Sequence, residues 1–452
     1  MGGGRCIFIV LVAGCRLHFA ELDDAALGGD GTAGDSTTDG GQGATCARAI
    51  PTMPTFWVDT NAGLDTNPGT QAAPTKTIAR ALSLTSASGG TIIVAPGNYL
   101  ESLDISTTQP LLLLSEQRYA ARMQRVNCAG CSELTVEGFE ITGSALPLVS
   151  ITAGARVTIR DNVVFDGSSA GIRITSGSTE IVIDSNVVYD SFASHIHVND
   201  ADNVTIRSNV LFDDNGPSGG LAKLWLETAA NTKVEGNIVF RSLGDNASYG
   251  LISLRDTTGA TVVENNLVAG SPNATNVYAS IGFDMATGTS LIRHNTFIGP
   301  MPGTAFGLGA GAMMTGSNFT VVNNLWASTG TLQPFTDGNA VALVALRHNL
   351  YWNAPLGPFQ PGGSPNPSGD TQAIVANPGL PATLPAAPTR IATGFVGDAK
   401  TTCEVHAQLV EAMAKIATTS PAKGAADPTQ SPAVDIRGNA RPALPAIGAY
   451  EP

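Results

Sequence analysis

The chain has 452 residues, of which 13% are charged, and it contains 51 Gly and 27 Pro. This composition is typical of many short strands and turns, and it is poor in long exposed helices. The formal net charge of −13 argues against nucleic acid as a partner, because phosphate binding requires clustered Lys and Arg. An acidic ligand would therefore need a local basic patch or a bridging cation.

The first residues read MGGGRCIFIVLVAGC, with a basic start, a short apolar stretch and small residues before Cys15. The pattern resembles a bacterial lipoprotein signal over residues 1–14, whose removal leaves Cys15 for lipidation. A plain secretory signal and a misplaced start codon are the alternatives. No apolar run approaches the roughly 18–20 residues that span a bilayer, so we expect membrane attachment only through a lipid. An outer-membrane lipoprotein or a secreted protein is predicted.

Residues 15–54 follow, and their central part is rich in Gly, Asp, Ser and Thr with almost no apolar anchors. Such a segment cannot bury enough surface to fold, so we expect a flexible acidic linker. Export makes four residues candidates for disulfides, with a pairing left open: Cys46, Cys128, Cys131 and Cys403. For the CxxC motif of Cys128 and Cys131 we favour a structural disulfide over a metal or redox role, because no second CxxC accompanies it.

A ten-residue motif recurs along the chain, from VTIRDNVVFD at 157–166 to VALRHNLYWN at 344–353. Each copy carries an Asn, and successive Asn residues are 23 to 29 positions apart. They are Asn162, Asn186, Asn209, Asn237, Asn266, Asn295, Asn324 and Asn349. Units of this length, made of β-patterned segments and turns, are too short for propeller blades and lack the helices of ankyrin-like repeats. They are typical of parallel β-helix coils, which stack about 4.8 Å apart.

Equivalent residues of stacked coils lie above one another, so the Asn residues are expected to form one column. Each side-chain amide would donate a hydrogen bond to the carbonyl of the next, at a bend whose left-handed backbone Asn tolerates. The adjacent column is uniformly aliphatic and is expected to fill the cylinder. It consists of Val163, Val187, Val210, Ile238 and Leu267.

Two further segments complete a resemblance to the pectate-lyase-like right-handed parallel β-helix proteins of bacterial surfaces. Residues 56–101 resemble the opening module of that group, in which an Asn-Pro-Gly-Thr turn precedes a short helix (about 75–85) that plugs the N-terminal end. Residues 431–452 resemble its closing segment. The resemblance implies an all-β fold, a right-handed parallel β-helix of about nine to eleven coils with a capping helix at each end. Because the group includes lyases, hydrolases, epimerases and proteins without known chemistry, function has to be argued from the site.

The expected organisation has four parts: a signal at 1–14, the linker at 15–54, the β-helix at 55–353 and a C-terminal wrap and capping segment at 354–452. Within the β-helix, the N-terminal module covers 55–101 and the repeats cover 134–353. In the last part, apolar residues recur with a helical period at Val405, Leu409, Val410, Met413 and Ile416. A helix there would cap the C-terminal end of the cylinder and hide its open edge.

A second strand follows each Asn strand, and period two places the residues between its apolar positions on the outside. Stacking predicts one outer column of Arg173, His197, Trp225, Ser253 and Gly282. The column on one side consists of Gly171, His195, Lys223 and Leu251, and the column on the other side consists of Thr175, Asn199, Glu227, Arg255 and Asp284. Both histidines are therefore expected to point outward into a charged patch.

This patch favours carbohydrate binding. An exposed Trp225 would be a stacking platform for a sugar ring, and the cations would bind uronate carboxylates. Further substrate-binding candidates are His195, Asn199 and Glu227. The alternative is that long polar side chains simply solvate an outer face. Metal chelation by His195 and His197, about 7 Å apart on one strand, is less favoured because no third ligand is evident.

Asp166, Asp190 and Asp213 end the same strand in three successive coils, and Asp214 is adjacent to the last. Stacked carboxylates repel one another unless a cation or hydrogen-bond donors compensate, and oxygen-only ligands suit calcium. The pattern therefore predicts a Ca²⁺ site at these four residues. Turn caps that fan outward are the alternative.

The resemblance to pectate-lyase-like enzymes then implies a mechanism. Calcium neutralises the uronate carboxylate, a Lys or Arg removes the C5 proton, and the 4-linked sugar leaves by β-elimination. By that resemblance Lys223 would be the base, Arg173 and Arg255 would hold the substrate, and His197 would be an alternative base or acid. No catalytic signature of the group is matched residue for residue.

The function predicted from these patterns is a calcium-assisted lyase that acts, as a monomer, on a uronate-containing polysaccharide. A non-catalytic carbohydrate-binding or adhesion protein is the alternative. A glycoside hydrolase ranks third, because the NTD, GHG and RIK signatures of β-helix polygalacturonases do not occur in the chain.

Overall fold

The computed structural model describes residues 47–452 with several gaps. These gaps are 86, 144–145, 214–221, 241–250, 271–278, 285–287, 300–303, 309–317, 329–332, 336–343, 354–369, 371, 382–383, 386–387, 392–393 and 396–397. The predicted signal, Cys15, the linker up to residue 46 and Asp214 therefore lie outside the described residues. No helix in the described part is long and apolar enough to cross a membrane.

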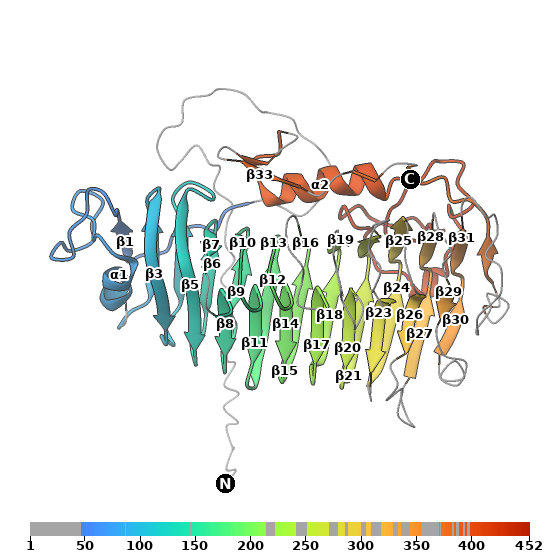
Figure 1. Cartoon of the computed structure of the whole chain (residues 1–452), viewed down its shortest axis with the longest axis horizontal. Coiled ribbons are helices and arrows are strands. Elements are labelled where there is room, and N and C mark those ends of the chain that lie inside the picture. The colour runs from blue at the N-terminus through green and yellow to red at the C-terminus, as the bar shows by residue number, and fades with distance from the viewer. Residues whose placement is uncertain are drawn as a thin grey trace, which may run out of the picture.

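The described chain winds into an elongated solenoid of parallel strands (Figure 1). In this part of the chain one sheet has 12 strands, each of which is hydrogen-bonded to the next one along the chain within the sheet. They are β1 (Thr55–Val58), β2 (Gly90–Val94), β4 (Leu111–Ser115), β6 (Leu134–Glu137), β9 (Thr158–Arg160), β12 (Ser178–Asp184), β15 (Ala201–Arg207), β18 (Ala230–Glu235), β21 (Thr258–Glu264), β24 (Thr289–Arg293), β27 (Asn318–Val322) and β30 (Val344–Arg347).

The other large sheet consists of two rows, joined where β5 pairs with both β7 and β8. The flank row is β7 (Glu140–Thr142), β10 (Val163–Phe165), β13 (Val187–Tyr189), β16 (Val210–Phe212), β19 (Ile238–Phe240), β22 (Leu267–Ala269), β25 (Thr296–Gly299), β28 (Leu325–Ser328), β31 (Leu350–Asn353) and β32 (Ile374–Val375). The site row is β3 (Gly97–Ile105), β5 (Ala121–Ala129), β8 (Val149–Thr152), β11 (Ile172–Thr175), β14 (Ile196–Asn199), β17 (Leu224–Glu227), β20 (Ile252–Arg255), β23 (Ala279–Asp284), β26 (Thr304–Leu308) and β29 (Gln333–Phe335). These repeating parallel pairs confirm the predicted parallel β-helix.

The Asn column forms the predicted hydrogen-bonded ladder. Each Nδ2 donates to the Oδ1 of the next Asn at 2.9–3.1 Å, from Asn162 to Asn349, and every member is buried. The ladder ends on Asp370, whose Oδ2 accepts a bond from Asn349 Nδ2 at 2.7 Å. The left-handed residue of each bend is the one before the Asn, for example Ser185 with φ 55° and Asn265 with φ 56°. The expectation that the ladder Asn itself has this backbone is therefore wrong.

The aliphatic column beside the Asn residues does not fill the cylinder. It is buried in a second core outside the cylinder, formed by Val163, Val187, Val210, Ile238 and Leu267 with Val405, Leu409, Val410 and Met413. The cylinder is filled instead by the following residues, Val164, Val188, Leu211, Val239 and Val268. The prediction placed the strand alternation one residue out of phase, and such a shift exchanges the two faces of a strand.

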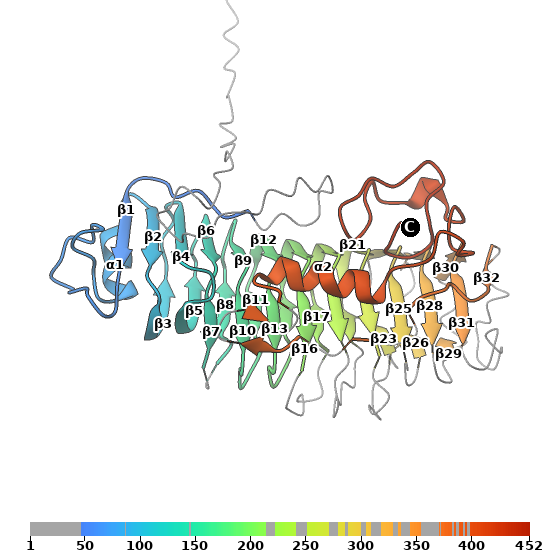
Figure 2. The same ribbon diagram turned by 90° about the horizontal axis from the view of Figure 1, so that it is seen from above.

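The two α-helices of the described chain occupy different places. Helix α1 (Ile78–Thr85) lies at the N-terminal end of the solenoid, as predicted (Figure 1). Helix α2 (Thr402–Met413) forms where the helical period predicted it, but it lies along the flank row and not across the C-terminal end (Figures 1 and 2). Its apolar face covers the outward aliphatic column, so burial of that column explains its position.

The C-terminal region also holds three short elements, β33 (Arg390–Ile391), β34 (Gly394–Phe395) and a 3₁₀ helix at Pro428–Gln430. A buried network attaches the start of α2 to the solenoid. Asp161 accepts hydrogen bonds from the Thr402 hydroxyl at 2.6 Å and from Tyr119, and Arg118 pairs with the same carboxylate at 2.7 Å. This network joins the first third of the solenoid to the start of the C-terminal segment 402–452.

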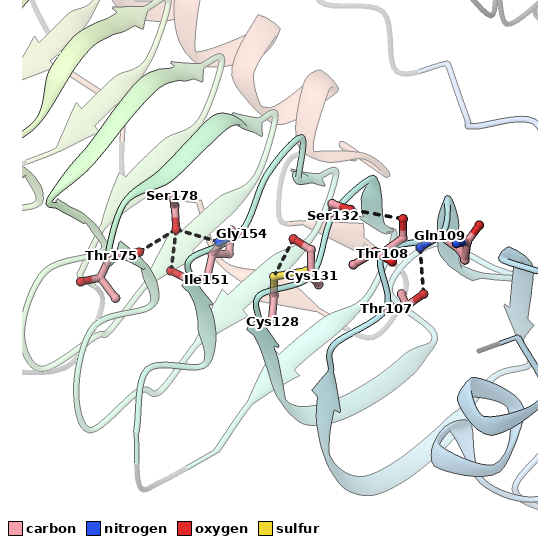
Figure 3. Close-up of a disulfide and its surroundings, with 10 residues drawn as sticks. All are labelled: Thr107, Thr108, Gln109, Cys128, Cys131, Ser132, Ile151, Gly154, Thr175 and Ser178. Atoms are coloured by element: carbon pink, nitrogen blue, oxygen red, sulfur yellow. Dashed lines mark hydrogen bonds between the residues drawn. A yellow bond between two sulfur atoms is a disulfide. The ribbon is translucent and has the colours of Figure 1, made fainter. Parts of the chain in front are cut away.

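Cys128 and Cys131 form a disulfide that is almost fully buried (Figure 3). The preference for a structural disulfide at this CxxC motif is confirmed, because the sulfur atoms are bonded to each other and their surroundings are closed to solvent. Cys403 is disulfide-bonded as well. Cys46 lies outside the described residues.

Candidate functional site

The strand register confirms the stacking, although not the exposure, of two of the three predicted columns of the site row. Arg173 pairs with His197, and His197 pairs with Trp225. Ser253 and Gly282 continue this column. The flanking column continues from Asn199 through Glu227 and Arg255 to Asp284. Side chains from successive coils are thereby brought together on one outer surface.

Glu227 is the centre of this surface. Its Oε2 accepts a hydrogen bond from Asn199 Nδ2 at 2.8 Å and lies 3.3 Å from His197 Nε2. Its Oε1 is 3.4 Å from Arg255 Nη1. The Glu227 side chain is 19% exposed, so one carboxylate organises three neighbours at the edge of solvent. A carboxylate partner for Nε2 leaves the lone pair of His197 on Nδ1.

His197 is held in its neutral form. Burial lowers its pKa first, the positive charge of Arg173 lowers it further, and the hydrogen bond and charge of Glu227 raise it in part. The imidazole is 12% exposed, so it is both accessible and able to accept a proton. A neutral imidazole can act as a general base, and its lowered pKa keeps it unprotonated at neutral pH while it reduces its basicity.

Arg173 is a cation that has no counter-charge within the described part of the chain. It forms no ion pair with any described residue, and its buried Nε has no hydrogen-bond partner among them. A desolvated guanidinium N–H without a partner costs free energy until an acceptor reaches it. The Arg173 side chain is thus suited to bind an anionic group beside His197.

Trp225 is not the exposed platform that was expected. Its ring stacks on His197, with ring centroids 4.6 Å apart and 12° between the ring planes, and the residue is 8% exposed. The reason is the coil spacing of about 4.8 Å, which puts flat side chains of one column in direct contact. Trp225 supports His197 from the next coil.

His195 does not point into solvent either. It is fully buried, with its Nε2 2.6 Å from the carbonyl oxygen of Phe212 and 3.1 Å from Asp213 Oδ1. Both neighbours are acceptors, so Nε2 carries a proton. Strand alternation predicts the side of the strand on which His195 lies, but it does not predict what covers that side.

Lys223 lies beside them and is also fully buried, where it forms an ion pair with Asp213 Oδ2. Burial raises the pKa of Asp213. His195 and Lys223 lower it more strongly, through their charges and their hydrogen bonds, to about 2. The predicted base and the last predicted metal ligand thus do converge, but as a closed ion pair. A buried ammonium bound to a carboxylate is not placed to take a proton from a polymer.

The remaining Asp residues of the predicted calcium site do not join Asp213. Asp166 is exposed and Asp190 is half-buried, and both have a left-handed backbone, with φ of 59° and 51°. This geometry is typical of turn residues. No group of three or more His, Cys, Asp or Glu among the described residues is placed to hold a metal ion. The described carboxylates therefore do not fit a calcium site, and Asp214 lies outside them.

Sequence reasoning missed two arrangements, the group centred on Glu227 and the buried group of His195, Asp213 and Lys223. The register placed Asn199 and Arg255 on the coils that flank Glu227, so stacking alone could have predicted the first. The second depends on the corner between the flank row and the site row, because Asp213 follows β16 and Lys223 precedes β17. No periodic pattern covers that corner.

Stacked coils, the Asn ladder and the outer columns define a parallel β-helix protein with a polar surface on one row of strands. A family model described as a right handed beta helix region matches residues 148–326. The solved structure of a pectate lyase, Pel9A, aligns with a TM-score of 0.57 and 12% identity, covering 88% of this chain and 96% of that one. The chain therefore has the right-handed parallel β-helix fold, which it shares with that pectate lyase.

Two other solved structures align over a smaller part of the chain. An alginate lyase from Paenibacillus sp. str. FPU-7 aligns with a TM-score of 0.42 and 15% identity, covering 59% of this chain and 96% of that one. PfbA, a surface adhesin of Streptococcus pneumoniae, aligns with a TM-score of 0.42 and 13% identity, covering 60% and 79%. No curated protein sequence matches this chain.

Proposed function

We propose that the chain binds a uronate-containing polysaccharide on the outer surface of the site row and cleaves it by β-elimination. The observation that carries this proposal is the guanidinium of Arg173, which has no counter-ion among the described residues, beside a neutral, partly exposed His197 that Glu227 orients. The pectate lyase with a related fold is named for a polymer of this class, which supports the choice.

In the proposed reaction, Arg173 binds the uronate carboxylate and thereby stabilises negative charge that develops at the adjacent C5. His197 takes the C5 proton on Nδ1, while Nε2 remains hydrogen-bonded to Glu227. The electrons of the C5–H bond form the C4=C5 double bond as the C4–O bond breaks. The departing sugar oxygen takes a proton from water. Lys223, buried against Asp213, keeps this surface in place and does not touch the substrate.

The proposed reaction does not include calcium, because the described Asp residues do not fit a calcium site. Asp214 lies outside the described residues, so the assay below tests a calcium requirement directly. We also propose an extracytoplasmic location, with a lipid at Cys15 as the tether. The buried disulfide of Cys128 and Cys131 supports this location, since disulfides form and persist in oxidising compartments.

The test is an ultraviolet assay for the new C=C bond, with the purified protein in calcium and in chelator. The panel contains pectate, alginate, glycosaminoglycans and neutral glycans. We expect an absorbance rise with at least one uronate polymer, and a loss of at least about 100-fold in rate in His197→Ala. Arg173→Ala should raise KM strongly, whereas Arg156→Ala, which removes an exposed Arg paired with Glu133, should not. Absence of any rise with every uronate polymer contradicts the lyase.

A non-catalytic carbohydrate-binding or adhesion protein is the second candidate. It is favoured by one observation, the burial of Lys223 in an ion pair, because this leaves the surface without the Lys base expected from the resemblance. Retardation in an affinity gel containing a uronate polymer, without any absorbance rise, would identify this function. Loss of that retardation in Arg173→Ala would place binding on the same surface.

A further inference from the structure

A hollow of about 450 Å³ lies at the N-terminal end of the site row, between α1 and the second half of β3. This volume is in the range of small-molecule sites. Figure 1 shows α1 beside β3 at that end of the solenoid. None of the residues assigned above to the candidate site lines the hollow.

The hollow and the candidate site lie on one continuous column of the site row. Asp104 of β3 pairs with Asn127 of β5, Asn127 pairs with Ser150 of β8, and Ser150 pairs with Arg173 of β11. His197 follows on β14. Three strand spacings separate Asp104 from Arg173, about 14 Å along the solenoid axis. A ligand that contacts both ends must therefore contain several sugar units.

The lining of the hollow has the chemistry of a site for a neutral sugar. Its hydroxyl groups come from Ser83, Thr85, Ser102, Ser106, Thr107 and Thr108. Leu82 adds an apolar patch from α1, and among the described residues of the lining Asp104 is the ionisable one and none is Lys or Arg. Hydroxyls, one carboxylate and an apolar wall suit the hydroxyl groups and C–H face of an uncharged sugar, whereas a uronate carboxylate would be repelled.

Asp104 is already oriented for this role. Its Oδ1 accepts a hydrogen bond from Asn127 Nδ2 at 2.8 Å, and its Oδ2 has no partner among the described residues. The side chain is exposed. One carboxylate oxygen is thus fixed from the neighbouring coil while the other remains free to accept sugar hydroxyls.

The walls of the hollow are held from both sides. Glu101 accepts bonds from the backbone N–H groups of Ile78 and Ala79 at 2.9 Å, which anchors the start of α1 to β3. On the opposite wall, Ser132 follows the Cys128–Cys131 disulfide (Figure 3), and its N–H donates to the Thr107 carbonyl at 2.9 Å. Its hydroxyl donates to the Thr108 carbonyl at 3.3 Å. A site formed in advance does not lose binding free energy to ordering of its walls.

We infer that this hollow is a distal subsite for a neutral sugar of the polysaccharide whose uronate lies at Arg173. The inference rests on the proposed function and narrows it, because it selects polymers that contain both uronate and neutral sugars. It assigns to α1, Asp104 and the disulfide-anchored turn a role in binding long chains.

The test measures affinity by calorimetry for rhamnogalacturonan oligosaccharides of increasing length, which alternate uronate and neutral sugars, and for polygalacturonate oligosaccharides of matched length. We expect wild-type affinity for the first series to rise sharply once the chain is long enough to span Asp104 and Arg173. Asp104→Ala should weaken binding of those long chains by about tenfold and leave short chains unchanged. Ser106→Trp, which places an indole at the rim of the hollow, should have the same selective effect.

Asp202→Ala is the matched control. Asp202 is also exposed, and its Oδ1 also accepts from an Asn Nδ2 at 2.8 Å, that of Asn231, but it lies on β15 of the 12-stranded sheet. If wild type binds long chains and neither Asp104→Ala nor Ser106→Trp weakens them, the distal subsite is wrong and the proposed function stands. If wild type binds no oligosaccharide of either series, the distal subsite is wrong, whereas the proposed function is overturned only if the ultraviolet assay is also silent with every uronate polymer.

Discussion

At the scale of single residues, the candidate surface depends on how buried and half-buried charges are compensated. Glu227 has three polar neighbours, Asp213 has a buried Lys and a buried His, and Arg173 has no counter-ion among the described residues. In a low-dielectric setting an unpaired charge is costly. Glu227 and Asp213 thus have partners within the protein, whereas the charge of Arg173 would be compensated by an anionic ligand.

The pKa of His197 gives a first test at this scale. Arg173 lowers it and Glu227 raises it, so Arg173→Ala should raise the pKa and Glu227→Gln should lower it further. The measurement is an NMR titration of the His197 ring resonances, which requires no substrate. Shifts of the same sign in both variants would show that the two groups do not act on His197 by charge.

Substitution of Lys223 tests whether this residue has a structural or a catalytic role. Lys223→Met removes the ammonium partner of the buried Asp213 carboxylate and leaves it with His195, and it should lower the free energy of unfolding by about 3 kcal/mol in urea denaturation. The double variant Lys223→Met with Asp213→Leu should recover much of that loss. As a matched control, Lys233→Met removes a lysine that is 43% exposed and paired with Glu235 and Glu264, and it should cost less than about 1 kcal/mol. Wild-type stability with abolished activity in Lys223→Met would instead assign Lys223 as the base.

At the scale of elements, the Asn ladder links the coils through one side chain in each. Asn237 both donates to Asn266 Oδ1 and accepts from Asn209 Nδ2, at 3.0 and 2.9 Å. Asp370 ends the series and only has to accept, which is the hydrogen-bonding capacity of a carboxylate. A position inside the ladder therefore requires Asn, which both donates and accepts, whereas the last position can be occupied by Asp, which only accepts.

Exchange of these two residue types should have unequal effects. Asn237→Asp removes the donor from a fully buried position and places a carboxylate against carbonyl acceptors, at a cost of at least about 3 kcal/mol in the free energy of unfolding. Asp370→Asn keeps an acceptor oxygen and should cost less than about 1 kcal/mol. Urea denaturation of both variants is the measurement, and equal losses would show that the ladder does not depend on its donors.

The same elements show why sequence reasoning succeeded for the fold and only in part for the site. The repeated Asn fixed the register, and the register placed Arg173, His197 and Trp225 on successive strands correctly. Exposure could not be predicted, because the burial of His195 and Trp225 depends on a corner and on ring stacking between coils. The position of α2 also escaped prediction, since a helical period identifies an apolar face and not the surface that it covers.

At the scale of the whole molecule, buried histidines make stability depend on pH. Burial lowers the pKa of His294 well below its usual value, aided by Arg441, and it lowers the pKa of His406, for which the hydrogen bond to the Gly236 carbonyl compensates only in part. The pKa of His197 is lowered as well. In the unfolded chain each of these groups has a pKa of about 6.5, so the unfolded state binds more protons below that pH and stability must fall there.

We therefore expect Tm to fall as pH decreases from about 7 to about 5. His406→Gln, which keeps a donor for the Gly236 carbonyl but does not titrate, should make this fall shallower. Asp213, with a pKa of about 2, contributes to acid sensitivity only at much lower pH. Thermal melts monitored by circular dichroism across this range are the measurement, and a Tm that rises toward pH 5 would contradict the assignment.

The Asn ladder also keeps the strands of neighbouring coils aligned when the coils differ in length. Coils differ in length from 23 to 29 residues between successive Asn residues, yet the flank strands that follow the Asn residues stay in register. The connection from β16 to β17 is longer than that from β10 to β11, so the extra residues enter at the corner between the flank row and the site row. A connection at this corner can therefore be exchanged without moving its neighbours, provided that the Asn and the two strands beside it are retained, and with them the buried pair of Asp213 and Lys223 at the β16–β17 connection.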